Sequence, residues 1–132
     1  MFKKYFLNDI FNLSLEIKPG DIIFIYGDLA SGKTTFSKHI INNLLGIKQD
    51  VISPTYTYYN KYGKNIYHFD LYRLNNYDEF FAIGGEEILD NSENISIIEW
   101  PEIIKPYFKP NIEIYLRKTK NELEREIGIV YN

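Results

Sequence analysis

The chain has 132 residues, a net charge of −3, 45% hydrophobic residues and no cysteine. These values are typical of one globular domain with a substantial core, and they exclude disulfides and thiolate metal sites. The chain has no long lysine- or arginine-rich stripe, no apolar run of membrane-spanning length and no signal-peptide pattern, so we expect a cytoplasmic protein that does not hold nucleic acid by itself.

The first clear elements are a strand and a helix. Residues 1–18 show one short amphipathic segment that is too irregular to assign. Residues 21–26 form a short, largely apolar run with three β-branched isoleucines, which predicts a buried strand. Apolar residues then recur every four positions, which predicts a helix over about 32–45 that ends at Gly46.

A glycine-rich loop joins this strand to this helix. Residues 27–34 read GDLASGKT, which fits the phosphate-loop pattern G-x-x-x-x-G-K-[ST]. Strand, loop and helix in this order point backbone N–H groups at an anion, so a tight turn that matches by chance is the weaker interpretation. Lys33 would reach the β- and γ-phosphates, and the Thr34 hydroxyl would hold Mg²⁺. The candidate nucleotide-contacting residues here are Asp28, Leu29, Ala30, Ser31, Gly32, Lys33, Thr34 and Thr35.

The rest of the chain alternates strands with short helices. Helices are predicted over 78–82 and 86–89, and Gly63-Lys64-Asn65 predicts a hairpin turn. The predicted extended segments are 51–52, 56–59, 66–71, 95–99, 112–117 and 126–130, the last two paired antiparallel across a turn near residue 121. The fold class is therefore α/β: a single P-loop NTPase-like domain over 1–132, whose mixed sheet has a parallel centre, antiparallel additions and flanking helices.

Two acids end predicted strands and are candidates for the second acid of a Mg²⁺ site. Glu99 ends the apolar strand 95–99, the position of that acid in P-loop enzymes, and Asp70 ends the preceding strand. A helix cap or a surface salt bridge is the alternative for each. Thr55, about twenty residues after the loop, could reach the γ-phosphate as switch loops do, although Ser-Pro-Thr is also a common turn.

Three other polar residues have less specific interpretations. His68 has no second histidine or cysteine nearby, so we expect a packed or hydrogen-bonded side chain and no metal ligand. His39 is expected on the helix surface. Arg73 could pair with Asp70 or with phosphate.

Four motifs occur in an order that resembles one family. They are GDLASGKTTF at 27–36, SPTY at 53–56, HFDLYRL at 68–74 and IEWPE at 98–102. Together they resemble TsaE (also called YjeE), a family of small bacterial P-loop ATPases, over residues 19–130. The phosphate loop is shared by many families, whereas the second pair of motifs at this spacing is far more specific.

The resemblance implies an activity and partners. The family binds ATP with Mg²⁺ and acts with TsaB and TsaD, which attach a threonylcarbamoyl group to adenosine 37 of tRNAs that read codons beginning with A. Hydrolysis is stimulated by that complex. The partners would carry the tRNA, which agrees with the missing basic patch, and no membrane is involved.

The resemblance also assigns roles to residues. Lys33 and Thr34 match the phosphate and Mg²⁺ residues, and Glu99 matches the Walker B-type acid. Thr55 matches the family's switch threonine. Asp70 and Trp100 match two positions that the family needs for activity, and Arg125 matches a family arginine near the nucleotide.

Two departures from the family pattern concern the loop and the N-terminus. The family usually has Gly-Ala where this chain has Ala30-Ser31, and a positive φ at Ala30 would strain the backbone by about 1 kcal/mol. The N-terminal helix is short in this chain, and the family's usual threonine near the start of that helix is replaced around Phe6, which removes an expected contact near the adenine.

Two other functions are compatible with the same loop. A small nucleoside or metabolite kinase would need a lid with several arginines, and the chain has only three. A non-catalytic, nucleotide-gated binding module would not need intact Lys33, Thr34 and Glu99.

Under the ATPase interpretation, we expect the tyrosine-rich residues 56–62 to lie near the γ-phosphate and to form part of the surface that meets TsaD.

Overall fold

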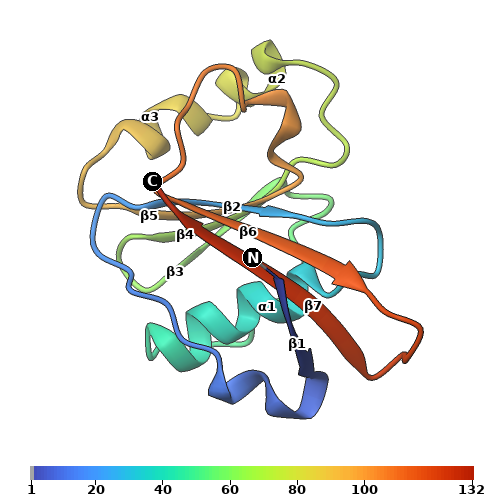
Figure 1. Ribbon diagram of the computed structural model, residues 1–132. Coiled ribbons are helices and arrows are strands. Elements are labelled where there is room, and N and C mark those ends of the chain that lie inside the picture. Colours follow the sequence, from blue (N-terminus) through green and yellow to red (C-terminus); the bar gives the residue numbers. More distant parts are fainter. Residues whose placement is uncertain (1) are drawn as a thin grey trace.

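The computed structural model describes residues 2–132, which form a seven-stranded mixed sheet with helices on both faces (Figure 1). The strand order across the sheet is β1-β7-β6-β2-β5-β4-β3. The strands are β1 (Phe2–Phe6), β2 (Ile22–Tyr26), β3 (Tyr59–Tyr62), β4 (Ile66–Asp70), β5 (Ile95–Glu99), β6 (Ile112–Lys118) and β7 (Glu124–Tyr131). The α-helices are α1 (Lys33–His39), α2 (Tyr77–Ala82) and α3 (Gly85–Asp90). The short helices η1 (Leu7–Asn12), η2 (Ile40–Leu44) and η3 (Pro101–Ile103) complete the list.

The centre of the sheet is parallel and its flanks are antiparallel. β2 pairs in parallel with β5 and β6, and β4 pairs in parallel with β5. β3 is antiparallel to β4, and β7 is antiparallel to β6 and β1. The predicted P-loop NTPase-like α/β class is confirmed. The carboxyl ends of β2, β4 and β5 meet at one edge, where α/β sheets bind their ligands.

Two apolar clusters hold the helices against the sheet. α1 covers one face, and α2 and α3 cover the other (Figure 1). Alternate residues of β2 serve the two clusters, because successive strand side chains point to opposite faces: Ile23 and Ile25 pack with Phe36, and Phe24 packs with Phe80. All of these side chains are fully buried. The central strands therefore read as continuous apolar runs, which made them recognisable in the sequence.

The N-terminal segment and the residues before β3 differ from the prediction. β1 lies at the edge of the sheet and buries only Tyr5, so its sequence carries no alternating pattern. The extended segment predicted over 56–59 is wrong for residues 56–58, where the backbone N–H of Tyr58 donates to the Pro54 carbonyl oxygen at 2.8 Å and closes a turn. Tyr58 has a φ of +68°, and the strand starts only at Tyr59.

The long helix predicted over 32–45 is present but not uniform. α1 is followed by one wider, π-type turn over Ile40–Leu44, in which Leu45 N–H donates to the Ile40 carbonyl oxygen at 2.8 Å. The expectation of a surface position for His39 is wrong. This residue is 2% exposed, and its Nε2 lies 2.7 Å from the Leu13 carbonyl oxygen.

Residues 51–52, which were predicted to be extended, belong to no strand of the sheet, and the remaining predicted elements are confirmed. The hairpin turn at 63–65 joins β3 to β4, and the late strands pair antiparallel as β6 and β7. α2 and α3 occupy the two predicted helical segments. Within residues 2–132, no helix combines the length and the apolar character that crossing a membrane requires.

Candidate active site

A cavity of about 370 Å³ opens at the edge of the sheet where the carboxyl ends of β2, β4 and β5 meet. It combines two cations with two acids, and hydroxyl and apolar groups complete its wall. The lining residues are Leu7, Leu29, Ala30, Gly32, Lys33, Thr34, Thr35, Ser53, Thr55, Asp70, Glu99, Trp100 and Arg125. Nearly all of the site residues predicted from the sequence therefore come together here.

The loop between β2 and α1 curls through two residues with a positive φ, Ala30 and Gly32, and through a close backbone approach at Gly27. Gly32 has a φ of +101°, and the nearest atom to a Cβ built there would be Arg125 Nε, at 3.9 Å. A Cβ at Gly27 would lie 2.8 Å from the carbonyl oxygen of Leu116, so only glycine fits. Ala30 has a φ of +62°. The positive φ considered for this departure from the family pattern is confirmed, and its strain is about 1 kcal/mol.

Lys33 is folded back onto its own loop. Its Nζ donates to the carbonyl oxygens of Gly27 at 2.7 Å and Asp28 at 2.8 Å, and it lies 4.2 Å from the centre of the Trp100 ring. Burial lowers the pKa of Lys33, and the negative charge of Glu99 opposes that shift. The ammonium group is thus held near the phosphate-loop backbone by two carbonyl groups that an anion could replace.

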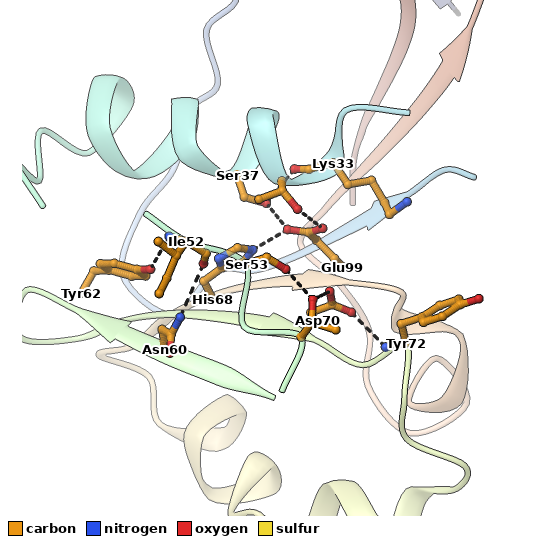
Figure 2. A network of polar contacts seen from close by, with 12 residues as sticks. Lys33, Ser37, Ile52, Ser53, Asn60, Tyr62, His68, Asp70, Tyr72 and Glu99 are labelled. Carbon is orange, nitrogen blue, oxygen red and sulfur yellow. Dashed lines mark hydrogen bonds and ion pairs between the residues drawn. The ribbon is translucent and has the colours of Figure 1, made fainter. Parts of the chain in front are cut away.

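Glu99 is the most enclosed acid of the site. It is 2% exposed and lies beneath α1 (Figure 2). Its Oε1 accepts a hydrogen bond from Thr34 Oγ1 at 3.0 Å, and its Oε2 lies 3.0 Å from Ser37 Oγ and 2.5 Å from His68 Nε2. A strand-end cap or surface salt bridge does not describe this residue, because its partners come from α1 and β4 inside the protein.

Asp70 connects the sheet to the segment before β3. Its Oδ2 accepts a hydrogen bond from Thr55 Oγ1 at 3.3 Å, and its Oδ1 accepts one from the backbone N–H of Tyr72 at 3.0 Å. Thr55 Oγ1 also shares a 2.6 Å hydrogen bond with Ser53 Oγ. The Tyr72 ring lies 4.7 Å from that of Trp100, so Asp70 and its neighbours form the wall opposite the loop.

The other predicted residues shape the cavity from its rim. Arg125 lines it and donates from Nε to the Ser31 carbonyl oxygen at 3.1 Å, which ties β7 to the loop. Asp28 and Ser31 are not among the lining residues and contribute through their backbone. Arg73 stacks over the Tyr56 ring at 4.7 Å, and residues 2–132 contain no ion pair between Arg73 and Asp70.

Three residues of the site were missed in the sequence. Ser37 lies three residues after Thr34 on the same face of α1, a spacing that could have indicated it. Leu7 and Ser53 also line the cavity. No local pattern marks Leu7, whereas Ser53 begins the SPTY motif, in which only Thr55 has a predicted role. The expectation of a hydrogen-bonded interior position for His68 is confirmed, since it is fully buried and bonded to Glu99.

The residues present fit a nucleoside triphosphate with Mg²⁺. Lys33, Thr34 and Thr35 begin α1, so their backbone N–H groups have no intrahelical partners and point at the loop, an arrangement suited to phosphate. Among residues 2–132, no group of three or more acidic or histidine side chains could hold a metal alone. Mg²⁺ commonly uses one or two protein groups together with phosphate oxygens and water, and Thr34 and Glu99 are placed to supply those two groups.

The sheet topology, the loop and the acid that ends β5 define a P-loop NTPase-like protein. The family described as "Threonylcarbamoyl adenosine biosynthesis protein TsaE" matches residues 8–127. The Rickettsia felis protein named tRNA threonylcarbamoyladenosine biosynthesis protein TsaE is 40% identical over 124 residues, which are 91% of this chain and 71% of that protein. The Bacillus subtilis protein of the same name is 34% identical over 114 residues, 83% of this chain and 69% of that protein.

A solved structure gives the same result. The crystal structure of Bacillus subtilis YdiB superposes with a TM-score of 0.71 and 25% sequence identity, over 99% of this chain and 86% of that chain. This chain belongs to the TsaE family. The resemblance stated from the four sequence motifs is therefore confirmed.

Proposed function

We propose that this chain is a Mg²⁺-dependent ATPase that supports the N6-threonylcarbamoyl modification of adenosine 37 in tRNAs that read codons beginning with A. The observation that carries the proposal is the 3.0 Å hydrogen bond from Thr34 Oγ1 to Glu99 Oε1, which joins the phosphate loop to the acid at the end of β5. The names of the relatives support the pathway.

Each residue of the site has a role under this proposal. Lys33 exchanges its two loop carbonyl partners for phosphate oxygens of ATP. Thr34 and Glu99 hold Mg²⁺, and Thr55 and Asp70 respond to the γ-phosphate from the opposite wall. Bound Mg²⁺ supplies neutralisation of the phosphate charge that develops during transfer to water. Arg125 and the ring of Trp100 close the rim and limit the access of bulk water.

The partners in this proposal are TsaD and TsaB. The net charge of −3 gives the chain no strong attraction for tRNA, so tRNA contact is indirect and passes through the complex. The cytoplasm is the compartment that this assignment requires.

A partner-stimulated ATPase assay tests the proposal. Phosphate release from ATP is measured with the chain alone, with TsaB and TsaD, and with both plus tRNA, each with and without Mg²⁺. We expect release that requires Mg²⁺ and rises when the partners are present. The matched control is the Lys33→Ala variant, which should remove the release under all conditions.

The same assay separates the alternatives. Phosphate transfer to a small acceptor, with no rise on adding the partners, would indicate a kinase. Nucleotide binding without turnover under any of these conditions would indicate a binding module. Either result would contradict the ATPase assignment.

A further inference from the structure

His68 is a buried polar residue to which the proposed mechanism gives no role. It lies on β4 with no exposed surface and is not among the residues that line the cavity. Its Nε2 lies 2.5 Å from Oε2 of Glu99, and Figure 2 shows the two side chains pointing toward one another beneath α1. A nucleotide in the cavity would therefore contact Glu99 but not His68.

The two carboxylate oxygens of Glu99 have different surroundings. Oε1 accepts from Thr34 Oγ1, which lines the cavity, whereas Oε2 lies inside the protein between Ser37 and His68. Ser37 carries a single hydroxyl proton, and the Lys33 carbonyl oxygen lies within its reach at 2.9 Å. Ser37 can donate to only one of these acceptors at a time, so His68 is the dedicated donor to Oε2.

The hydrogen bonds of His68 also fix its tautomer. Nδ1 is buried and has no hydrogen-bond partner within residues 2–132. A proton on Nδ1 would be an unpaired buried donor, which costs more than an unpaired lone pair. The geometry therefore places the ring proton on Nε2, where it is donated to Glu99.

We propose that His68 is a positioning residue that anchors Oε2 of Glu99 and thereby presents Oε1 to Thr34 and to the metal. This inference rests on the proposed function, because it assumes that Glu99 holds Mg²⁺. Groups that orient a metal-binding side chain commonly change metal affinity by about 10- to 100-fold when they are removed. Removal of the Nε2 donor should weaken Mg²⁺ binding and leave metal-free nucleotide binding unchanged.

The experiment measures ADP affinity by calorimetry, first in EDTA and then over a series of Mg²⁺ concentrations. We expect His68→Leu to bind ADP in EDTA like the wild type but to need about tenfold more Mg²⁺ to reach its full affinity. His68→Gln, whose amide nitrogen replaces the Nε2 donor, should keep most of the wild-type Mg²⁺ response. The matched control is His39→Gln, a change at the other buried histidine, which should leave the response unaltered.

Several results would overturn the inference. One is an unchanged Mg²⁺ response in His68→Leu, and another is an equal loss in His68→Leu and His68→Gln, which would indicate ring packing in place of hydrogen bonding. If His68→Leu fails to fold, His68→Asn replaces it, because its shorter amide withdraws the donor from Glu99; an unchanged response there would also contradict the inference. A wild-type protein whose ADP affinity ignores Mg²⁺ would instead refute the metal assignment of Glu99.

Discussion

On the phosphate-loop side of the cavity, Glu99 is 2% exposed and is surrounded by three hydrogen-bonding side chains. On the opposite side lie residues 53–58, which we call the switch segment. Tyr56 in this segment is 80% exposed, and the segment connects to β4 through a 3.3 Å hydrogen bond from Thr55 to Asp70 and a 3.0 Å hydrogen bond from the Asp70 backbone N–H to the Tyr58 carbonyl oxygen. Buried polar groups with several partners are costly to displace, whereas an exposed turn with few partners opens at low cost.

This difference indicates how the site could respond to a ligand. The loop, α1 and β5 form a preorganised half that needs little rearrangement to accept phosphate. The switch segment can change conformation without disturbing that half, because within residues 2–132 its hydrogen bonds go to its own residues and to β3 and β4, and not to the loop, α1 or β5. A bound nucleotide can therefore order the switch segment, and a partner protein that binds this segment could distinguish the ordered conformation from the free one.

The largest expected effect comes from removing the cation of the preorganised half. Lys33→Ala deletes the group that would make charge-assisted hydrogen bonds to phosphate, so ATP affinity should fall about 1,000-fold. Calorimetric titration measures this loss. Lys38→Ala removes an exposed lysine of the same helix and should bind ATP normally, whereas wild-type affinity in Lys33→Ala would refute the phosphate-loop assignment.

The second effect separates binding from hydrolysis within the same half. Glu99→Ala should keep much of the nucleotide affinity but slow partner-stimulated hydrolysis by about 100-fold or more, because Mg²⁺ loses an oriented ligand. Single-turnover phosphate release measures the rate, and denaturant unfolding checks that the variant folds. Glu87→Ala, which removes an exposed acid on α3, is the control. Normal hydrolysis in Glu99→Ala would show that Glu99 is not the acid of the Mg²⁺ site and would assign that role to Asp70.

The preorganised half was also the half that the sequence could predict. The loop pattern between an apolar strand and an amphipathic helix located Lys33 and Thr34. Because the carboxyl ends of parallel strands meet at one edge, acids at the ends of β4 and β5 were expected near the loop. The partners of Glu99 could not be predicted, since the bonds to Ser37 and His68 join residues 62 and 31 positions away in the chain.

The errors concentrate where local propensity and tertiary contacts disagree. Residues 56–59 are three tyrosines and a threonine, which favour a strand, but the hydrogen bond from Tyr58 to Pro54 closes a turn instead, and the strand begins at Tyr59. β1 has no alternating pattern because it is an edge strand with one buried residue. His39 was expected at the surface since helical spacing alone does not show that η1 and the residues after it cover that face.

The third prediction tests whether the exposed half meets the partner. Tyr56 is 80% exposed beside the cavity and has Arg73 over its ring, so it is the tyrosine of the switch segment that is most available to TsaD. Tyr56→Ala should weaken association with TsaB–TsaD by about 2 kcal/mol, since aromatic anchors carry much of the energy of an interface. Binding is measured with ATP, with ADP and without nucleotide, and the affinity should depend on the nucleotide.

Two variants control this measurement. Tyr131→Ala removes a ring that is 54% exposed at the opposite edge of the sheet, so association should not change. Tyr59 packs 5.2 Å from Phe69, so Tyr59→Ala should mainly lower the free energy of unfolding. Equal affinity in all three nucleotide states, with no loss in Tyr56→Ala, would leave the switch segment without a partner role.

The smallest expected effect concerns the backbone of the loop itself. Ala30 and Gly32 both have a positive φ, which strains the alanine but not the glycine. Ala30 is exposed and has a φ of +62°, so Ala30→Gly should raise the free energy of unfolding by about 0.5 kcal/mol, because the relief of about 1 kcal/mol of strain exceeds the added entropy of the unfolded chain. Gly32→Ala is the matched opposite change: its Cβ has room, but its φ is +101°, so it should lower that free energy by about 1 to 2 kcal/mol through backbone strain alone. Urea unfolding of the two variants and the wild type measures both shifts. A lower unfolding midpoint for Ala30→Gly would show that the alanine is not strained, and the loop would then be held in this shape by its side-chain contacts.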